Sequence, residues 1–265
     1  PRGRIVELFG PPGGGKTVLT LMAIAQIQKI EKESKCFFID SEATYDPYFT
    51  SKLGVDTNRL AIIKSSEAEK IFDIVKKLIQ VERPHIIVID SLAALMPMED
   101  VDKTQETSTM ATRARVITRG LGVCNAVNFN TLIMLTNQIR ANMKQYGLPT
   151  TTTGGFAVKH LTSMRVEVRA GDSIVENKER VGQVIKFKVI KNKLGPPYRE
   201  GSIDFRYDGT TNPVSELITL GLIKDVIKRR GAYYDLYDQN YLGRELLAQT
   251  LNDDKNLYKK LESDL

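Results

Sequence analysis

The chain has 265 residues, of which 42% are hydrophobic and 26% are charged, a composition typical of a globular protein with one or two domains. No apolar run is long enough to span a bilayer and the first residues lack the apolar core of a signal peptide, so we expect no membrane segment and a cytoplasmic location. The net charge is +6, yet residues 140–200 hold 12 Lys or Arg against 5 Asp or Glu, which favours a polyanionic ligand about as much as a solvated strand face.

Apolar runs and helical patterns alternate through the first half of the chain. Runs that are apolar throughout are typical of parallel strands buried on both faces. These runs cover residues 4–9, 36–40, 60–64, 85–90 and 131–136. Amphipathic patterns at 16–31 and 67–82 indicate helices between the strands. We therefore predict an α/β fold whose mostly parallel sheet is flanked by helices.

Strict alternation replaces this pattern after residue 160. Apolar and charged residues alternate in 184–191 and 202–207, which predicts half-exposed antiparallel strands that extend the sheet. From about residue 212 the pattern is short and mixed, with a helix near 214–221, a hairpin around YYDLYDQNYLG and a final helix. We predict a core domain over 1–211 and a small C-terminal α/β lobe over 212–265.

Two long connections are expected, at about 93–109 and 139–155. Each follows the carboxyl end of a predicted parallel strand, the edge at which open α/β sheets bind ligands. Connections of this length without regular structure are uncommon in compact domains and are usually functional or disordered. Both connections are therefore candidate binding loops.

The two cysteines, Cys36 and Cys124, lie in apolar sequence far apart in the chain. Their spacing does not match that of metal ligands. We expect buried free thiols, as is usual in a reducing compartment.

A glycine-rich motif, GPPGGGKT at residues 10–17, lies between the first predicted strand and the first predicted helix. Gly10, Gly15, Lys16 and Thr17 match the P-loop pattern in the context that this pattern requires. Backbone N–H groups of such a loop converge on phosphates, and the helix N-terminus adds its partial positive charge. We expect Lys16 to reach the β- and γ-phosphates of a nucleotide and the Thr17 hydroxyl to ligate Mg²⁺.

The acid that completes a P-loop site is expected at Asp90, which ends the apolar strand HIIVID, although many such aspartates only cap a turn. The Gly/Pro-rich loop resembles that of AAA+ ATPases, whose catalytic glutamate directly follows this aspartate. Here Ser91 follows it, so the base must come from elsewhere. The candidate is Glu42, which can orient a water at the γ-phosphate if the strand ending at Asp40 neighbours the P-loop strand. Taken alone, Glu42 would more often be a surface carboxylate.

Further motifs follow the P-loop in order: FFIDSEATYDPYFTSKLGVD, HIIVIDSLAALMP, LTNQIR, TTTTGG and VIKNKLGPPYR. Together they closely resemble the RecA family of homologous-recombination ATPases, over nearly the whole chain except its C-terminal part. NQIR and TTTTGG are much more specific than the P-loop. The resemblance implies a bacterial or bacteriophage RecA-like core that binds ATP and Mg²⁺. It also implies a filament on single-stranded DNA that pairs homologous double-stranded DNA, exchanges strands and hydrolyses ATP.

The resemblance also assigns catalytic roles. Glu42 matches the family's catalytic glutamate, and Gln138 matches the glutamine that senses the γ-phosphate and passes its state to the adjoining DNA loop. Lys191 and Lys193 match two lysines that reach across the filament interface to the neighbour's ATP; alone they would be taken for exposed lysines. Lys16 completes this catalytic set.

The metal and nucleotide contacts follow from the same motifs. Thr17 and Asp90 are the expected Mg²⁺ ligands. Phe49 replaces the tyrosine expected at its position, so that ring stacking on adenine is retained without the hydroxyl. The implied ATP contacts are Gly10, Pro11, Pro12, Gly13, Gly14, Gly15, Lys16, Thr17, Asp46, Phe49 and Tyr207.

The two long connections match the family's DNA-binding loops. Thr hydroxyls and glycines in the second loop suit contacts to phosphates that do not read bases. Arg115 aligns with a DNA-contacting arginine, and Arg119, four residues later on the same helix face, extends that surface by geometry alone. Met110 either wedges between bases or packs in the core. The expected DNA contacts are Met110, Arg115, Arg119, Arg140, Thr153, Gly154, Gly155, Phe156 and Arg169.

Alternatives to a recombinase remain at this level. One is a RecA-fold ring helicase, against which TTTTGG and the paired lysines argue. Another is a scaffold that binds DNA under the control of ATP, with hydrolysis only resetting it. The chain also begins without Met at its first core strand, whereas family members usually carry an N-terminal helix and strand that dock onto the adjacent subunit. Either upstream residues are missing, or polymerisation works differently.

Overall fold

The computed structural model describes residues 1–101, 110–141 and 150–265. The chain folds into two compact units. The first unit contains Pro1–Ala170 and Phe187–Glu200, and the second contains Gly171–Lys186 and Gly201–Leu265. No helix in the described part of the chain combines the length and the hydropathy needed to cross a bilayer.

The first unit is built on parallel strands. They are β1 (Ile5–Gly10), β2 (Cys36–Asp40), β3 (Leu60–Lys64), β4 (Ile86–Asp90) and β5 (Leu132–Ala141). The strand order is β3-β2-β4-β5-β1, every neighbouring pair in it is parallel, and β1 also pairs in parallel with β7. This mostly parallel sheet between helices confirms the predicted fold class.

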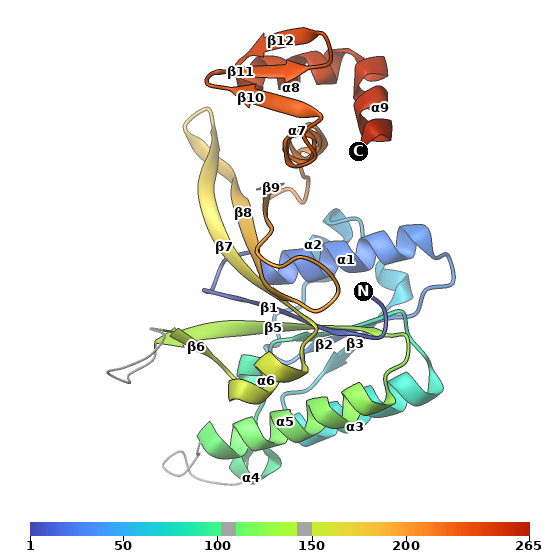
Figure 1. The fold of residues 1–265 in the computed structure, drawn as a ribbon. Helices are drawn as coiled ribbons and strands as arrows, with labels where there is room; N and C mark the ends of the chain where they lie inside the picture. The colour runs from blue at the N-terminus through green and yellow to red at the C-terminus, as the bar shows by residue number, and fades with distance from the viewer. Residues whose placement is uncertain (102–109, 142–149) are drawn as a thin grey trace. The chain divides into compact units, whose positions relative to one another are not determined.

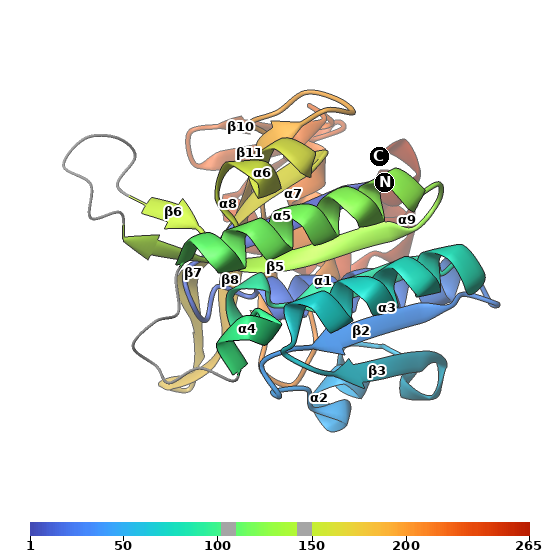
Figure 2. The same cartoon turned by 90° about the horizontal axis from the view of Figure 1, so that it is seen from below.

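Helices cover both faces of this sheet (Figures 1 and 2). α1 (Lys16–Ile30) lies on one face, whereas α3 (Ala68–Val81), α5 (Met110–Val127) and α6 (Gly155–Leu161) lie on the other. One apolar cluster joins the second group of helices to alternate residues of the strands, for example Ile71 to Ile5 and Ile87. Both cysteines are buried free thiols, and burial raises the pKa of Cys124 to about 12.

Smaller elements connect these strands and helices. They are α2 (Pro47–Lys52), 3₁₀ turns at Thr57–Arg59 and Leu92–Ala94, α4 (Met98–Val101) and β6 (Thr150–Thr152). The expectation of irregular connections over 93–109 and 139–155 is therefore wrong for the described parts. The first connection contains α4, and the second contains the end of β5 and the whole of β6. Residues 102–109 and 142–149 of these connections lie outside the described residues.

Three strands extend the sheet beyond β1 in the order β7-β8-β9. β7 (Met164–Glu176) and β8 (Glu179–Asn192) form a hairpin, and β9 (Glu200–Arg206) follows β8. The hairpin turns at Asn177 and Lys178, both at positive φ, as a two-residue turn of type I′ requires. β7 is absent from the sequence prediction even though apolar and charged residues alternate in RVEVR at 165–169.

The second unit has its own apolar core, formed by side chains such as Leu217, Ile218, Ile227, Leu236 and Leu247. Its separate sheet runs β10-β11-β12 with antiparallel pairs. Besides parts of β7, β8 and β9, this unit contains α7 (Pro213–Ile223), β10 (Ile227–Arg230), β11 (Tyr233–Leu236), β12 (Gln239–Leu242), α8 (Gly243–Asp253) and α9 (Lys255–Asp264). The domain boundary near residue 212 stays a prediction, because the compact units also divide the β7–β8 hairpin.

Gly120 sets the close packing of α5 on α3. A Cβ at this position would lie 2.2 Å from the Phe72 ring, whereas a Cβ at Gly122, in the same helix, would have nothing within 4 Å. We expect Gly120→Ala to lower the free energy of unfolding by about 1–3 kcal/mol through overpacking. Gly122→Ala should raise it by about 0.5–1 kcal/mol because alanine is the better helix former. Urea unfolding of both variants measures the difference, and equal effects would contradict the packing argument.

Candidate nucleotide and DNA site

The P-loop follows β1 and starts α1. Gly10 lies against β7, since a Cβ there would stand 1.9 Å from the Val168 carbonyl oxygen. Gly15 has φ 92° and precedes the first residue of α1, a conformation that favours glycine. The motif's glycines thus let the loop turn tightly and enter the helix.

Lys16 is held inside this loop. Its ammonium group donates to the Pro11 carbonyl at 2.7 Å and to the Gly10 carbonyl at 3.2 Å, and the residue is only 8% exposed. Burial lowers the pKa of Lys16, while Asp90 and Glu42 oppose the shift. The positive charge therefore lies at the loop, where phosphate oxygens could replace the carbonyl oxygens.

Asp90 joins the P-loop helix to β5. Its Oδ2 accepts a hydrogen bond from the Thr17 hydroxyl at 2.6 Å, and its Oδ1 accepts one from the Thr136 hydroxyl. Burial is the main cause that raises the pKa of Asp90, and the two hydroxyl bonds act against it. Adjacent hydroxyl and carboxylate oxygens are the hard ligands that Mg²⁺ takes together with nucleotide phosphates and water. The Thr17–Asp90 pair therefore fits the expected metal.

Glu42 reaches the site by a different route from the one expected. β2 does not neighbour β1, because β4 and β5 lie between them, so that condition for placing Glu42 is wrong. The Glu42 carboxylate instead accepts hydrogen bonds from the Ser91 hydroxyl and from Gln138 Nε2, the latter at 3.4 Å. The base and sensor candidates are thus in contact over the carboxyl ends of β4 and β5.

Ser91 fixes Glu42 from one side, and its own carbonyl accepts a hydrogen bond from the Ser41 hydroxyl at 2.9 Å. We expect Ser91→Ala to lower ATP turnover by about 10- to 150-fold, because a hydrogen bond to a charged group contributes roughly 1.5–3 kcal/mol. The KM for ATP should stay within about twofold, since the serine touches the base and not the P-loop. Steady-state kinetics measures both constants, and a rise in KM at constant turnover would contradict this role.

The expected ATP contacts outside the P-loop are Asp46 and Phe49 in the first unit and Tyr207 in the second. The Asp46 carboxylate caps α2 by accepting from the N–H groups of Tyr48 at 2.8 Å and Phe49 at 3.3 Å. Phe49 is half-buried in that helix. Tyr207 belongs to the second unit, where the Arg180 guanidinium lies 5.9 Å from its ring centroid. Asp46 therefore has a structural use as a helix cap whether or not it binds a base.

Lys191 and Lys193 lie together beside α6. Both ammonium groups donate to the His160 carbonyl, at 3.2 and 3.3 Å, and Lys191 also donates to the Lys159 carbonyl at 2.5 Å. Burial is the largest cause that lowers the pKa of Lys191, followed by the charges of Lys193 and Arg165. The two ammonium groups therefore share one carbonyl and concentrate positive charge beside α6, although β8 ends at Asn192 and only Lys191 is on the strand.

The predicted DNA contacts fall into separate groups. Arg115 and Arg119 are exposed and line one groove of about 620 Å³ between α5 and α3, with Glu69 and Asp73 on its other side. Arg169 forms an exposed ion pair with Glu167 at 2.6 Å. Met110 begins α5 and Arg140 lies near the end of β5, but their side chains are outside the described residues.

The end of the second loop leads directly into α6. Gly154 and Gly155 have φ of 87° and 64°, and Phe156 projects outward with 89% of its surface exposed. The hydroxyls of Thr152 and Thr153 are buried without a hydrogen-bond partner in the described structure. Two orphaned hydroxyls beside an exposed ring suit a segment that acquires its partners from a ligand.

Sequence reasoning missed the polar residues buried behind the site, namely Glu7, Thr136, Asn137 and Arg165. A single acid in IVELF and the pair TN at the end of LIMLTN break otherwise apolar strands, and a charge at such a position needs a partner. That signal identifies buried polar residues, but it does not say which of them pair.

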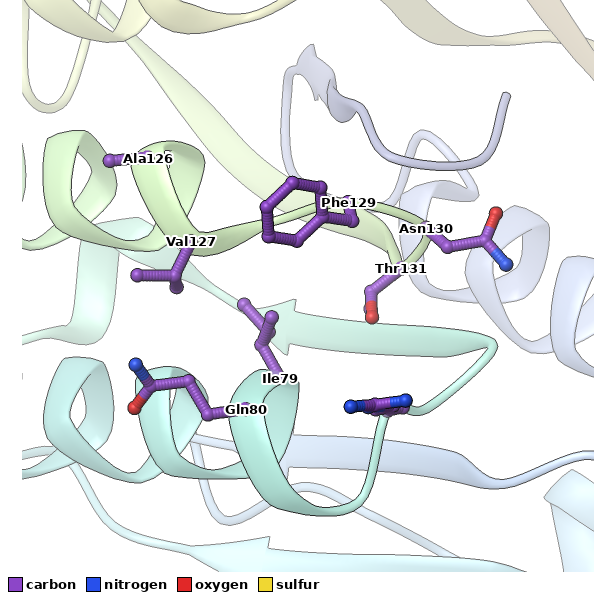
Figure 3. Close-up of a pocket in the computed structure, with 8 residues that line it drawn as sticks. Ile79, Gln80, Ala126, Val127, Phe129, Asn130 and Thr131 are labelled. Atoms are coloured by element: carbon purple, nitrogen blue, oxygen red, sulfur yellow. The ribbon is translucent and has the colours of Figure 1, made fainter.

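A pocket of about 670 Å³ lies away from all these residues (Figure 3). Ile79, Val127 and Phe129 give it an apolar wall, and Thr131 lies at its side. It is formed where α3 and α5 end, next to the amino ends of β4 and β5, whereas the P-loop lies at the carboxyl end of β1. None of the predicted site residues lines this pocket.

Comparison with known proteins agrees with the motifs. A family model described as the RecA N-terminal domain matches residues 1–212. The protein named Protein RecA of Acinetobacter baumannii is 37% identical over 247 residues, which cover 92% of this chain and 70% of that protein. The Protein RecA of Mycoplasma mycoides is 35% identical over 98% of this chain and 76% of its own length, and that of Paracoccus denitrificans is 35% identical over 100% and 75%. The chain therefore belongs to the RecA family of recombination ATPases.

Proposed function

We propose that this chain is an ATP-dependent recombinase that forms a filament on single-stranded DNA, pairs it with homologous double-stranded DNA and exchanges the strands. The observation that carries the proposal is the contact between Gln138 and Glu42 at the end of β5. β5 continues directly toward the second candidate DNA loop, so one strand joins a group near the nucleotide to a group near the DNA. A nucleotide-gated DNA filament needs such a connection.

The nucleotide chemistry follows from the P-loop side of the site. Lys16 and the loop N–H groups hold the phosphates, and the Thr17 and Asp90 oxygens hold Mg²⁺, which neutralises charge on the transferred phosphoryl group. Glu42 orients the attacking water, with Ser91 steadying the carboxylate. Gln138 leaves Glu42 to bond the γ-phosphate and returns when that phosphate is lost, because its amide can donate to either group.

The second copy of the chain supplies the remaining charge. Lys191 and Lys193 lie at the end of α6, where they donate to backbone carbonyls, and these hydrogen bonds are weaker than those to a charged phosphate. Facing the neighbour's triphosphate, the two ammonium groups stabilise charge that develops in the transition state. Bound ATP thereby strengthens the contact between adjacent copies of the chain, and its hydrolysis weakens that contact.

DNA binding on this proposal is through phosphates. Thr153, Gly154 and Gly155 offer hydroxyl and N–H donors, while Arg115 and Arg169 add charge. Contacts of this kind do not read bases, so pairing with the incoming duplex supplies the sequence specificity. The affinity for single-stranded DNA should then fall steeply as the salt concentration rises.

The decisive measurement is ATP turnover with and without single-stranded DNA, on the chain with any upstream residues of its natural sequence restored. We expect stimulation by DNA, a filament visible by electron microscopy and joint-molecule formation with homologous duplex. Closed rings in place of filaments would favour a helicase. Turnover that ignores DNA, together with salt-independent DNA binding, would contradict the proposal.

A further inference from the structure

A charged pair and an amide lie inside the apolar core behind the site. Glu7 and Asn137 are 0% exposed, and Arg165 is 7% exposed. The three residues stand on the adjacent strands β1, β5 and β7, and Arg165 is directly opposite Glu7 in the β1–β7 register. The nucleotide chemistry above uses none of them.

The Glu7 carboxylate bonds both neighbours. One oxygen accepts from Arg165 Nε at 2.5 Å, and the other accepts from Asn137 Nδ2 at 2.9 Å. The Arg165 guanidinium also lies 4.3 Å from the centroid of the Phe9 ring, which fixes its position further. A buried charge is costly unless it is paired and hydrogen-bonded, and here each oxygen of the carboxylate has a donor.

Asn137 links this pair to both halves of the site. Its Nδ2 donates a second hydrogen bond to the Thr153 carbonyl at 2.9 Å, and its Oδ1 accepts one from the Gln138 backbone N–H at 3.0 Å. A carboxylate only accepts hydrogen bonds, so Glu7 dictates that the NH₂ end of the amide faces inward. That orientation is the one in which Asn137 can hold Thr153 and Gln138 at once.

We propose that Glu7 and Asn137 are positioning residues that couple the γ-phosphate sensor Gln138 to the Thr153 end of the second DNA loop, with Arg165 balancing the charge of Glu7. The inference rests on the proposed function, because it explains how a change at Gln138 is felt by DNA. A shift of the Gln138 backbone moves the amide that holds the Thr153 carbonyl. The orphaned hydroxyls of Thr152 and Thr153 then change their exposure to a phosphate backbone.

The test removes both charges of the pair; Glu7→Gln keeps the size of the side chain, and Arg165→Gln shortens it but leaves a polar amide. Glu7→Gln alone leaves a buried guanidinium uncompensated and risks unfolding, so it is combined with Arg165→Gln. The new amide at position 7 can donate as well as accept, and Asn137 is then free to turn its oxygen toward Thr153. We expect turnover without DNA and the KM for ATP to stay within about twofold, while the DNA concentration for half-maximal stimulation rises about tenfold or more.

Thr131→Val is the matched control. This buried hydroxyl donates to the Pro84 carbonyl at 2.8 Å, in the same β5 region but at the amino end of the strand. It should lower stability and leave the DNA response within about twofold. A double variant whose DNA response is also unchanged would overturn the positioning role while the proposed function stands. A parallel loss of turnover without DNA would overturn it as well, because the pair would then be merely structural.

A second readout needs no DNA. The chain has no tryptophan, so Phe156→Trp places a single reporter at the exposed start of α6. We expect ATP to shift the emission of this tryptophan. In the Glu7→Gln/Arg165→Gln background the shift should fall by about half or more. The affinity for ATP should stay within about threefold, which corresponds to roughly 0.7 kcal/mol. An undiminished shift would contradict the coupling. If the unmodified chain binds ATP but its turnover ignores DNA, the proposed function fails first and the coupling to DNA fails with it.

Discussion

Glu42→Gln is expected to lower ATP turnover by about 10²–10⁴-fold, the usual contribution of a positioned acid or base. The change keeps the size of the side chain and its contacts with Ser91 and Gln138, so ATP binding should persist. A quenched-flow measurement of phosphate release together with equilibrium ATP binding separates the two. Glu82→Gln is the control, because this exposed carboxylate pairs with Lys35, beside the amino end of β2.

The same variant distinguishes two uses of the chemistry. If filaments and strand pairing persist while turnover collapses, hydrolysis serves recycling, and ATP acts as a switch during pairing. If pairing is lost together with turnover, hydrolysis drives the exchange itself. Retention of more than half of the turnover would remove Glu42 from the role of base and leave Asp90 and bound water as the remaining acceptors.

The position of Glu42 shows that the order of strands in the sheet cannot be predicted from the patterns of the single strands. The strands β1, β2, β4 and β5 were predictable from their apolar runs, because burial on both faces leaves that signature in the sequence. The order of strands is set by the crossover connections, and runs of similar composition carry no record of it. Glu42 was therefore predicted as a candidate for a reason that the sheet order does not support, and it reaches the site through Ser91 and Gln138.

The P-loop was predictable because its signal is local. Gly15 is required by its positive φ, which arises within the motif itself. The close approach that requires Gly10 is to Val168 of β7, far along the chain, so that reason was not visible in the sequence. The Glu7, Asn137 and Arg165 network was not predictable, because its members are distant in sequence and meet only when β5 and β7 flank β1. β7 is a similar case: its alternating pattern was visible in the sequence, but its parallel pairing with β1 was not.

Lys191→Ala combined with Lys193→Ala is expected to lower DNA-stimulated turnover by about 10²–10³-fold, the range seen when a group that stabilises transition-state charge is removed. ATP binding to each chain should change little, because both ammonium groups contact the end of α6 and not the chain's own P-loop. Single replacements should cost less than the pair, since both lysines share one carbonyl and either can occupy the place of the other.

Mixing variants tests whether the lysines act on the neighbour. A Lys16→Ala chain keeps Lys191 and Lys193 but cannot hold ATP productively, whereas the double lysine variant keeps its P-loop. In a head-to-tail assembly of the two variants in equal amounts, each junction pairs the P-loop of one chain with the lysines of the next. About a quarter of the junctions then combine an intact P-loop with intact lysines. A mixture of two inactive chains should therefore regain up to about a quarter of the normal turnover.

The control adds Glu42→Gln to the double lysine variant, which should abolish the recovery because that chain holds the only productive ATP. Recovery that survives this addition would mean that turnover comes from the Lys16→Ala chain. No recovery in any mixture would mean that the lysines act within their own chain, in which case the carbonyls of α6 are their lasting partners and ATP does not report the contact between copies.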